Sequence, residues 1–321
     1  MVAAPSRAAL FDALSDTTRL RIVALLRAME LSVGELAQVL GQSQPRVSRH
    51  VRILIDAGLA ERRREGSWVF LSLARAPLVA PLLNLLDAWA ALDGEEPSMI
   101  ADAARLAAVR ADRAAAAERY FASHAAEWDQ LRSLHVAESE VEAAITRALG
   151  GAPLGRLVDI GTGTGRMLEL FGRSADHALG IDRSPEMLRL ARAKLTEAGL
   201  GPVDLRQGDM YALPLPSGSA DTVILHQVLH YAQQPAGAVA EAARLLAPGG
   251  RLLVIDFAAH DREELRSRDA HARLGFADAA VTGFMERAGL EAAVVDRLEG
   301  GALTVTLWLG TRVPQRLQVV A

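Results

Sequence analysis

The chain has 321 residues, of which half are apolar, and a formal net charge of −4. This length predicts about two domains, since one core commonly serves roughly 100–200 residues, and the absence of cysteine excludes disulfides, thiolate metal sites and a cysteine nucleophile. With no run of about eighteen apolar residues and no apolar signal-peptide core in residues 1–10, we expect a soluble cytoplasmic protein without a membrane partner.

Short helices and a hairpin are predicted before residue 75. Apolar residues at helical spacing in 10–14 and 20–26 indicate two helices, separated by a Ser-Asp pair that can cap the second. A third helix is expected over 33–40, where a following glycine suits a left-handed helix stop. A further helix follows Ser43. Segments 59–64 and 68–73 then flank a Glu-Gly-Ser turn, which predicts a two-stranded wing.

The helix after Ser43 combines an apolar stripe with a polar face. Val47, Val51 and Leu54 recur at helical spacing, which predicts that they are buried. The opposite face can address base edges, because arginine pairs with guanine, while glutamine or serine can meet adenine and other edges. The candidate DNA-binding residues are Gln44, Arg46, Ser48, Arg49 and Arg52 of this helix, with Arg62, Arg63 and Arg64 of the wing over the backbone or minor groove.

Positive charge is concentrated in this region. Between 44 and 64 six arginines face only two acidic residues, which suits contacts with phosphates. Lys194 is the only lysine, however, so an arginine-biased chain with a solvated basic face is the alternative interpretation. The succession of helix, turn and wing favours DNA binding.

Residues 5–95 resemble the ArsR-type winged-helix repressors. The resemblance is carried by Leu14-Ser15-Asp16-Thr17-Thr18-Arg19-Leu20-Arg21-Ile22, Leu36-Ala37, Ser48-Arg49-His50-Val51-Arg52-Ile53-Leu54 and Ala57-Gly58-Leu59. It implies a repressor that binds double-stranded operator DNA. The chain departs from the metal sensors of this family, because Ser32-Val33-Gly34-Glu35 stands where those proteins carry cysteines. We therefore expect no metal site, and we interpret His50 as a packed histidine.

An apolar helix and a linker are predicted next. Segment 78–92 has more apolar surface at helical spacing than one small domain would bury, so it is a candidate face for a homodimer. The Ala- and Arg-rich stretch from about 99 to 118 predicts a connecting helix. The expected domains are a winged helix at 1–95, a connecting helix at 96–115, a nucleotide-binding domain at 116–310 and a tail at 311–321.

Strands and helices alternate through the second half of the chain. Strands are predicted at 156–160, 177–182, 204–207, 222–226, 251–256 and 302–309. This alternation predicts a parallel, doubly wound sheet. The expected fold class is therefore an α+β winged helix-turn-helix domain followed by an α/β Rossmann-like domain.

A glycine-rich loop follows the first of these strands. In Asp159-Ile160-Gly161-Thr162-Gly163-Thr164-Gly165 the glycines would let the backbone approach a ligand at the carboxyl edge of the sheet. The second strand ends at Asp182, whose carboxylate can hold two ribose hydroxyls, and the third is followed by Asp209-Met210. A nicotinamide dehydrogenase is an alternative for such a loop, although the later segments do not fit it.

The region 116–310 is very similar to class I S-adenosylmethionine-dependent methyltransferases, through Asp182-Arg183-Ser184-Pro185-Glu186-Met187-Leu188, Ala212-Leu213-Pro214-Leu215-Pro216 and Ala220-Asp221. The resemblance implies that S-adenosylmethionine or S-adenosylhomocysteine binds here. Its methionine part would contact the glycine-rich loop, and its ribose would contact Asp182 at the end of the second strand. Its adenine would lie between Met187 and Met210, with its amino group near Asp209. The implied cofactor-binding residues are Asp159, Gly161, Thr162, Gly163, Gly165, Asp182, Arg183, Met187, Asp209, Met210 and His226.

The sequence assigns no catalytic residue. A base is needed only if the methyl acceptor must lose a proton. His226, His230, His260 and His271 could each serve as that base in principle, although a single histidine is more often a polar surface residue or a packed one. Segment 226–231 lacks the Pro-Pro-aromatic signature of DNA amino-methyltransferases. The absence of cysteine excludes cytosine-carbon and arsenite methylation. The residues Tyr120, Trp128 and Asp129 are candidates for a lid or for the core.

The whole chain resembles ArsR-type domains fused to methyltransferase-like domains, which implies a regulator of methionine or methyl-cycle genes. Our leading hypothesis is a homodimeric repressor whose second domain binds S-adenosylhomocysteine or S-adenosylmethionine as effector. The alternative is an active small-molecule methyltransferase whose first domain serves autoregulation or targeting.

Overall fold

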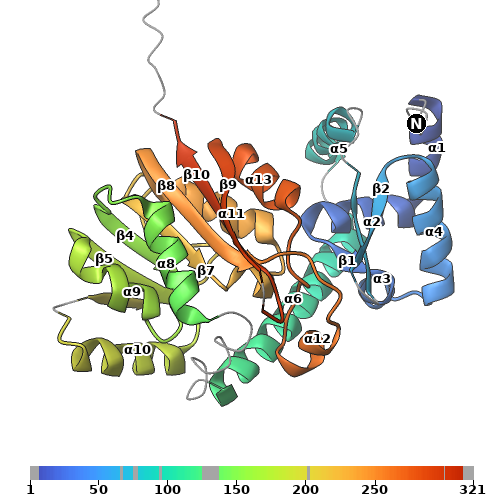
Figure 1. The fold of residues 1–321 in the computed structure, drawn as a ribbon. Coiled ribbons are helices and arrows are strands. Elements are labelled where there is room, and N and C mark those ends of the chain that lie inside the picture. The colour runs from blue at the N-terminus through green and yellow to red at the C-terminus, as the bar shows by residue number, and fades with distance from the viewer. Residues whose placement is uncertain are drawn as a thin grey trace, which may run out of the picture. The chain divides into compact units, whose positions relative to one another are not determined.

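The computed structural model describes residues 7–65, 68–74, 79–93, 96–124, 137–200, 203–299 and 301–313. The chain divides into two compact units, Met1–Ala115 and Ala116–Ala321 (Figure 1). Among the described residues, no helix is both long enough and apolar enough to cross a membrane.

The first unit is a small helical domain with a hairpin. Its helices are α1 (Arg7–Leu14), α2 (Thr17–Ala28), α3 (Val33–Leu40), α4 (Gln44–Asp56), α5 (Val79–Asp93) and the first part of α6 (Pro97–His124). Its strands are β1 (Leu31–Ser32), β2 (Ala60–Glu65) and β3 (Trp68–Leu73). The connecting helix expected over 96–115 is thus part of a longer helix, which continues into the second unit.

Local caps explain where these helices begin and end. The side chain of Asp16 accepts a hydrogen bond from the backbone N–H of Arg19 and caps α2. Ser32 and Glu35 form a capping box at the start of α3. At the other end of α3, Gly41 has a left-handed backbone with φ 65°, which glycine adopts without a Cβ clash.

The core of the first unit fixes the orientation of α4. Val47, Val51 and Leu54 are fully buried and belong to the same apolar cluster as Ile22 of α2. The sequence stripe is therefore the inner face of α4, as expected from its spacing. The hairpin pairs Ala60 with Leu73 through to Glu65 with Trp68, and β1, which the sequence did not predict, joins β3 on its other side.

The second unit is an α/β domain. Its strands are β4 (Arg156–Ile160), β5 (His177–Asp182), β6 (Asp204–Gln207), β7 (Ala220–His226), β8 (Leu246–Phe257), β9 (Leu290–Leu298) and β10 (Val305–Arg312). Its helices are α8 (Glu138–Leu149), α9 (Arg166–Phe171), α10 (Pro185–Glu197), α11 (Pro235–Leu245), α12 (Glu264–Arg268) and α13 (Asp278–Arg287), with 3-10 turns at Gly172–Ser174 and Leu229–Tyr231.

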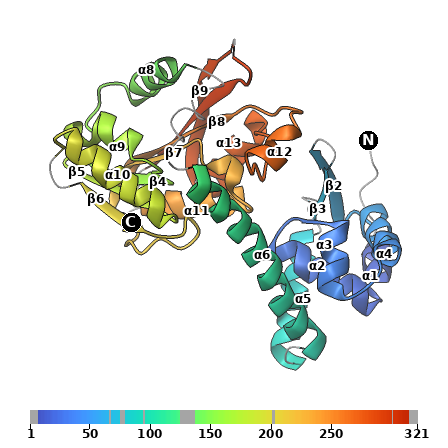
Figure 2. The same ribbon diagram turned by 90° about the horizontal axis from the view of Figure 1, so that it is seen from below.

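These strands form one sheet in the order β6-β5-β4-β7-β8-β10-β9. All of them except β10 are labelled in Figure 2. The five strands from β6 to β8 are parallel, as the alternation of strands and helices predicts. Only β10 departs from the expected parallel direction, because it runs antiparallel to both β8 and β9. A short connection is enough for an antiparallel pair, whereas a parallel pair needs a crossover. The last strand also continues to Arg312, beyond the expected boundary at 310.

Both faces of the sheet are covered. Along β7, Val223 and Leu225 belong to an apolar cluster with residues of α11 and α13, whereas Ile224 between them belongs to a second cluster with residues of α8 and α9. Strand residues alternate between the two faces of a sheet. Because both faces are buried, the strands have continuous apolar sequences. The polar loops lie at the carboxyl edge of the sheet.

Candidate functional sites

Helix α4 presents the predicted polar face to the outside. Gln44, Arg46, Arg49 and Arg52 are exposed, and Ser48 is half-buried. Because the apolar stripe of α4 faces the core, these side chains lie on the helix surface that can enter a groove. The geometry is that of a helix able to read base edges.

The wing contributes one described arginine. Arg62 is exposed on β2, where it pairs with Leu71 of β3 in the hairpin register. Arg63 and Arg64 lie in the same strand, but their side chains fall outside the described residues, as do Gly66 and Ser67 of the predicted turn. Trp128 and Asp129, two of the lid candidates, also lie outside them, and of Tyr120 only the backbone, in α6, is described.

His50 lies against the start of α2. Its Nδ1 atom is 3.6 Å from Oδ1 of Asp16, the residue that caps that helix, and the imidazole is half-buried. This contact joins two helices of the first unit and suits a packed histidine. Within the described ranges, no group of three or more His, Cys, Asp or Glu side chains is arranged to hold a metal ion.

In the second unit the glycine-rich loop connects β4 to α9. Gly161, Gly163 and Gly165 all have positive φ, at 72°, 53° and 84°. A Cβ at Gly161 would lie 2.4 Å from Cγ2 of Val228, so the loop packs too closely against the segment after β7 to accept a side chain there. This backbone can approach a bound nucleotide directly, which other residues at these positions would hinder.

Asp159 is buried at the end of β4. The hydroxyl of Thr162 donates a hydrogen bond to Oδ2 of Asp159 at 2.6 Å, and the two side chains are 6 % and 1 % exposed. The contact holds the first turn of the loop on the strand. It also places a carboxylate beneath the loop backbone.

Asp182 accepts hydrogen bonds from two loops. The backbone N–H of Gly163 donates to its Oδ2 and that of Ser184 to its Oδ1, both at 2.8 Å. Burial raises the pKa of the Asp182 carboxyl above its ordinary value, although these hydrogen bonds favour the charged form and oppose the rise. The side chain keeps some exposed surface, so it can still meet a ligand.

The residues after β6 lie beside this carboxylate. The backbone N–H of Gly208 donates to the carbonyl of Asp182 at 3.0 Å. Asp209 is exposed and accepts a hydrogen bond from the backbone N–H of Tyr211 at 3.0 Å, while Met210 is half-buried. A carboxylate and an apolar side chain therefore lie next to the position expected for an adenine ring.

The remaining predicted residues differ in accessibility. Arg183 is exposed, and its carbonyl accepts a hydrogen bond from the side chain of Gln207 at 3.0 Å. Met187 is only 2 % exposed in the first turn of α10, so it presents little surface to a ligand. His226 is half-buried at the end of β7, where Gln227 has a positive φ of 49°.

Parallel strands bring these residues to one edge. Asp159 is paired with Gly180 of β5 and Ile224 of β7, and Asp182 is paired with Gln207 of β6. The carboxyl ends of the four strands therefore lie side by side, together with the loops that follow them. The cofactor-binding residues predicted from the sequence are gathered there. Met187 is among them, but it is buried and presents little surface to a ligand.

A buried histidine-carboxylate pair lies at the same edge. Nδ1 of His230 is 2.8 Å from Oδ1 of Asp256, and the backbone N–H of His230 donates to Oδ2 at 3.1 Å. The two residues are 2 % and 0 % exposed. Among the described residues, Nε2 of His230 has no hydrogen-bond partner.

Sequence reasoning had named His230 without preferring it and had not named Asp256. The ring of His271 lies 4.3 Å from that of His230, centroid to centroid, and stacks on Phe257 at 5.8 Å. A carboxylate that directly follows the apolar run of β8 was the available signal, because its position at the strand end places it beside the end of β7.

The two units match two different families. Residues 16–62 match the family described as bacterial regulatory protein, arsR family, and residues 158–254 match the family described as methyltransferase domain. The first match covers α2 to β2, including α4. The second covers the loop, Asp182 and most of the parallel strands.

Individual relatives of the chain include proteins named as methyltransferases. A phosphatidylethanolamine N-methyltransferase from Cereibacter sphaeroides is 38 % identical over 112 residues, which are 35 % of this chain and 55 % of that protein. A demethylmenaquinone methyltransferase from Deinococcus radiodurans is 37 % identical over 154 residues, which are 46 % of this chain and 62 % of that protein. The chain thus spans about half the length of the curated relatives it matches.

A solved structure shows the same fold. The YcgJ protein from Bacillus subtilis superposes with a TM-score of 0.51 at 18 % identity, over 55 % of this chain and 99 % of that one. At this identity the likeness establishes the architecture only.

Proposed function

For a chain that joins an ArsR-type winged-helix domain to a class I methyltransferase domain, we propose a DNA-binding transcriptional regulator whose second domain binds its effector. The effector is S-adenosylhomocysteine or S-adenosylmethionine. The observation that carries the proposal is that one chain combines an exposed, arginine-rich face on α4 with a preformed nucleotide loop held by Asp182.

The first domain binds double-stranded operator DNA as a repressor. Arg46 and Arg49 of α4 reach base edges, and Arg62 of the wing contacts the backbone or the minor groove. Phe11 on α1 and Trp89 on α5 are 51 % and 50 % exposed, and large apolar side chains at the surface of a domain are suited to an interface. We assign them to a homodimer, which would present two recognition helices to a two-fold symmetric operator.

The second domain holds the nucleoside at the carboxyl edge of its sheet. Asp182 accepts hydrogen bonds from the ribose hydroxyls, and Asp209 with Met210 meets the adenine. The methionine part lies on the loop, where Gly161 leaves no room for a side chain and Asp159 lies beneath the backbone. These residue types and this close backbone approach fit the proposed ligand.

The sign of regulation depends on which ligand distinguishes two states of the protein. S-adenosylmethionine and S-adenosylhomocysteine differ by one methyl group and one positive charge. A ligand shifts operator affinity only by its differential affinity for the two states. We favour the neutral S-adenosylhomocysteine, and we propose methionine or methyl-cycle genes as the targets.

Footprinting on the DNA upstream of the protein's own gene tests this function. A protected segment with two-fold symmetry, whose protection changes when one of the two ligands is added, is the expected result. The Arg46→Ala and Arg49→Ala variants test whether α4 makes the contact. If both variants protect the DNA as the wild-type protein does, the binding belongs to another surface.

Methyl transfer is a second candidate function, favoured by the His230–Asp256 pair. With Nδ1–H held by Asp256, Nε2 of His230 can take a proton from the acceptor. S-adenosylmethionine supplies the methyl group: the acceptor atom bonds to the methyl carbon, and the electron pair of the breaking C–S bond stays on sulfur. The proton that the acceptor releases goes to Nε2.

The relatives named for phosphatidylethanolamine and demethylmenaquinone suggest probes for this candidate. The protein is incubated with S-adenosylmethionine labelled in the methyl group and with either phosphatidylethanolamine vesicles or a demethylated naphthoquinol. Label in the probe, lost in His230→Gln while ligand affinity is kept, supports methyl transfer. Equal labelling by wild type and His230→Gln would remove this pair from the reaction.

A further inference from the structure

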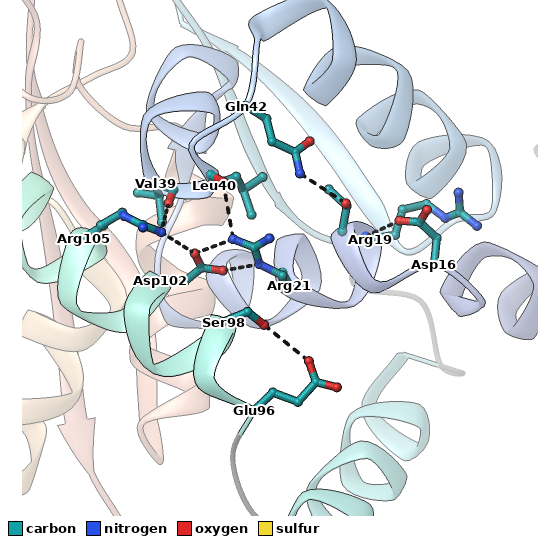
Figure 3. A network of polar contacts seen from close by, with 11 residues as sticks. Asp16, Arg19, Arg21, Val39, Leu40, Gln42, Glu96, Ser98, Asp102 and Arg105 are labelled. Carbon is teal, nitrogen blue, oxygen red and sulfur yellow. Dashed lines mark hydrogen bonds and ion pairs between the residues drawn. The ribbon is translucent and has the colours of Figure 1, made fainter.

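Asp102 of α6 is a buried acid held by two arginines (Figure 3). Its side chain is 4 % exposed. Arg21 of α2 donates from Nε to Oδ2 at 2.6 Å and from Nη2 to Oδ1 at 2.7 Å, and Nη1 of Arg105 donates to Oδ1 at 3.4 Å. A two-pronged contact of this kind fixes the direction as well as the distance between two helices.

The same two arginines reach the end of α3. Nη2 of Arg21 donates to the carbonyl of Leu40 at 3.4 Å, and Nη1 of Arg105 donates to the carbonyl of Val39 at 3.2 Å. The last four carbonyls of a helix lack partners within it. In α3 the first two of these are taken by the backbone N–H groups of Gly41 and Gln42, so the arginines complete the set.

This helix end is the first half of the turn that leads to the recognition helix. Only Gly41, Gln42 and Ser43 separate α3 from α4. Gln42 is itself tied to α2, because its side-chain amide donates to the hydroxyl of Thr18 at 3.3 Å. The turn is therefore held on one side by α2 and, through Asp102 and Arg105, by α6 (Figure 3).

Apolar contacts follow the same face of α6. Leu106 and Val109, four and seven residues after Asp102, are each 5 % exposed and belong to the core cluster that includes Val47 and Val51 of α4. Residues at this spacing share one face of a helix. The helix then continues to His124, past the boundary between the two units at Ala115.

A purely structural role does not explain why this helix contact is a buried ion pair. Burying an ion pair gives little net stability compared with apolar residues of similar size, and its best-attested use is to specify one arrangement. The pair Arg27–Asp87 offers a comparison, because it joins α2 to α5 with side chains that are 47 % and 53 % exposed. No hydrogen bond from that pair to a carbonyl of α3 is found among the described residues.

We propose that Asp102 is a positioning residue that couples α6 to the helix-turn-helix, so that a ligand-dependent displacement of α6 alters the turn before α4 and hence operator affinity. This inference rests on the proposed function, since it needs an effector in the second unit. In the coupled protein, α6 moves the carbonyl-capping arginines with it. Without Asp102, α6 keeps only the Arg105 contact to Val39 and its apolar contacts with the core, which we expect to transmit little of the displacement.

The test compares Asp102→Asn with Asp87→Asn in the full-length protein. Operator affinity is measured by fluorescence anisotropy with no ligand and with saturating S-adenosylhomocysteine or S-adenosylmethionine. Ligand affinity is measured by calorimetry with and without operator, because coupling between two binding sites is reciprocal. Two ratios measure the coupling: the operator dissociation constant with ligand over that without it, and the ligand dissociation constant with operator over that without it. We expect both ratios to fall to within about twofold of unity in Asp102→Asn and to keep the wild-type value in Asp87→Asn.

Circular dichroism would detect whether Asp102→Asn fails to fold. In that case two further variants test the same contact. Arg21→Lys keeps the charge but loses the two-pronged contact, and Arg105→Ala removes only the contact to Val39 and the weaker contact to Asp102. Both should reduce the ligand-induced shift in operator affinity, Arg105→Ala the less.

The outcomes separate this inference from the proposed function. If the wild-type protein responds to ligand and the folded variants at Asp102 and Arg21 respond equally, the role of Asp102 is overturned. The proposed regulator function is then unaffected. Loss of the response in Asp87→Asn as well would make it a general effect of weakening α2 and would also overturn the role. A wild-type protein indifferent to both ligands refutes the proposed function, and the coupling with it.

Discussion

The backbone N–H of Gly163 donates a hydrogen bond to Oδ2 of Asp182 across 2.8 Å. The contact joins the glycine-rich loop after β4 to the end of β5, nineteen residues further along the chain. Ser184 donates to the other carboxylate oxygen from the start of α10. One carboxylate thus fixes two loops and still faces the edge where the nucleotide is proposed to bind.

Replacing this carboxylate should weaken ligand binding more than it weakens the fold. In Asp182→Asn one oxygen remains to accept a hydrogen bond, whereas the new amide group meets an N–H donor. We expect affinity for S-adenosylhomocysteine to fall by about tenfold or more, which corresponds to about 1.4 kcal/mol, as measured by calorimetry.

Asp204→Asn is the matched control for this change. Asp204 is an exposed acid at the beginning of β6, at the opposite edge of the sheet from the loops. Its replacement removes the same charge and should leave ligand affinity unchanged. An equal loss in both variants would point to net charge rather than to a contact with the ligand.

The close approach of the loop to Val228 makes Gly161 sensitive to substitution. In Gly161→Ala the new Cβ meets Val228 at 2.4 Å, and a positive φ of 72° adds about 1–2 kcal/mol for an L-residue. Gly218 has a similar φ of 71° and nothing within 4 Å of its Cβ position. Thermal unfolding should therefore show a larger loss in Gly161→Ala than in Gly218→Ala, and Val228→Ala should restore part of it.

Loss of the exposed arginines of α4 should affect DNA binding alone. Arg46→Ala and Arg49→Ala each remove a group proposed to reach base edges, which is typically worth about 1–3 kcal/mol of discrimination. Anisotropy titrations should show weaker binding to the operator and a smaller preference over random DNA, with unchanged ligand affinity. Arg192→Ala, which removes an exposed arginine from α10, should leave operator binding unchanged. Loss of ligand binding in the α4 variants would instead indicate misfolding.

The stability of the second unit should depend on Asp221 at acid pH. Hydrogen bonds from Arg156 lower the pKa of the Asp221 carboxyl to about 2. Its stabilising effect is therefore complete above the ordinary value of 3.8 and is lost as the pH falls from there toward about 2. Because the Arg156 and Asp221 side chains are 44 % and 40 % exposed, solvent screening limits the effect to less than about 1 kcal/mol.

Urea unfolding between pH 5 and about pH 2 measures this dependence. The free energy of unfolding should fall less steeply with decreasing pH in Asp221→Asn than in the wild-type protein, and the two curves should converge at the acid end. Parallel curves over the whole range would show that the ion pair is absent in solution.

Periodicity and local chemistry predicted much of this molecule. The buried stripe of α4, the glycine stop after α3 and the loop after β4 each depend on residues a few positions apart. Asp159 and Asp182 could be predicted at one edge because successive parallel strands end together. For such features the chain segment itself contains the determining interaction.

Contacts between distant segments could not be predicted in this way. Arg21 and Asp102 are separated by 81 positions, and neither differs in type from many other charged residues of the chain. Asp256 and His230 meet only because β7 and β8 are neighbours in the sheet. β9 was missed because most of its residues are at least partly exposed, which removes the continuous apolar pattern of the inner strands.

The central claim is that the second domain controls the first. Fluorescence anisotropy of the labelled operator, at fixed salt, with no ligand, with saturating S-adenosylmethionine and with saturating S-adenosylhomocysteine, tests it most directly. The account predicts a shift in the dissociation constant of at least about fivefold with one ligand, and about tenfold more of that ligand should be needed to produce the shift in Asp182→Asn. Tight operator binding that is identical in all three titrations, in a protein that demonstrably binds both ligands, would contradict it.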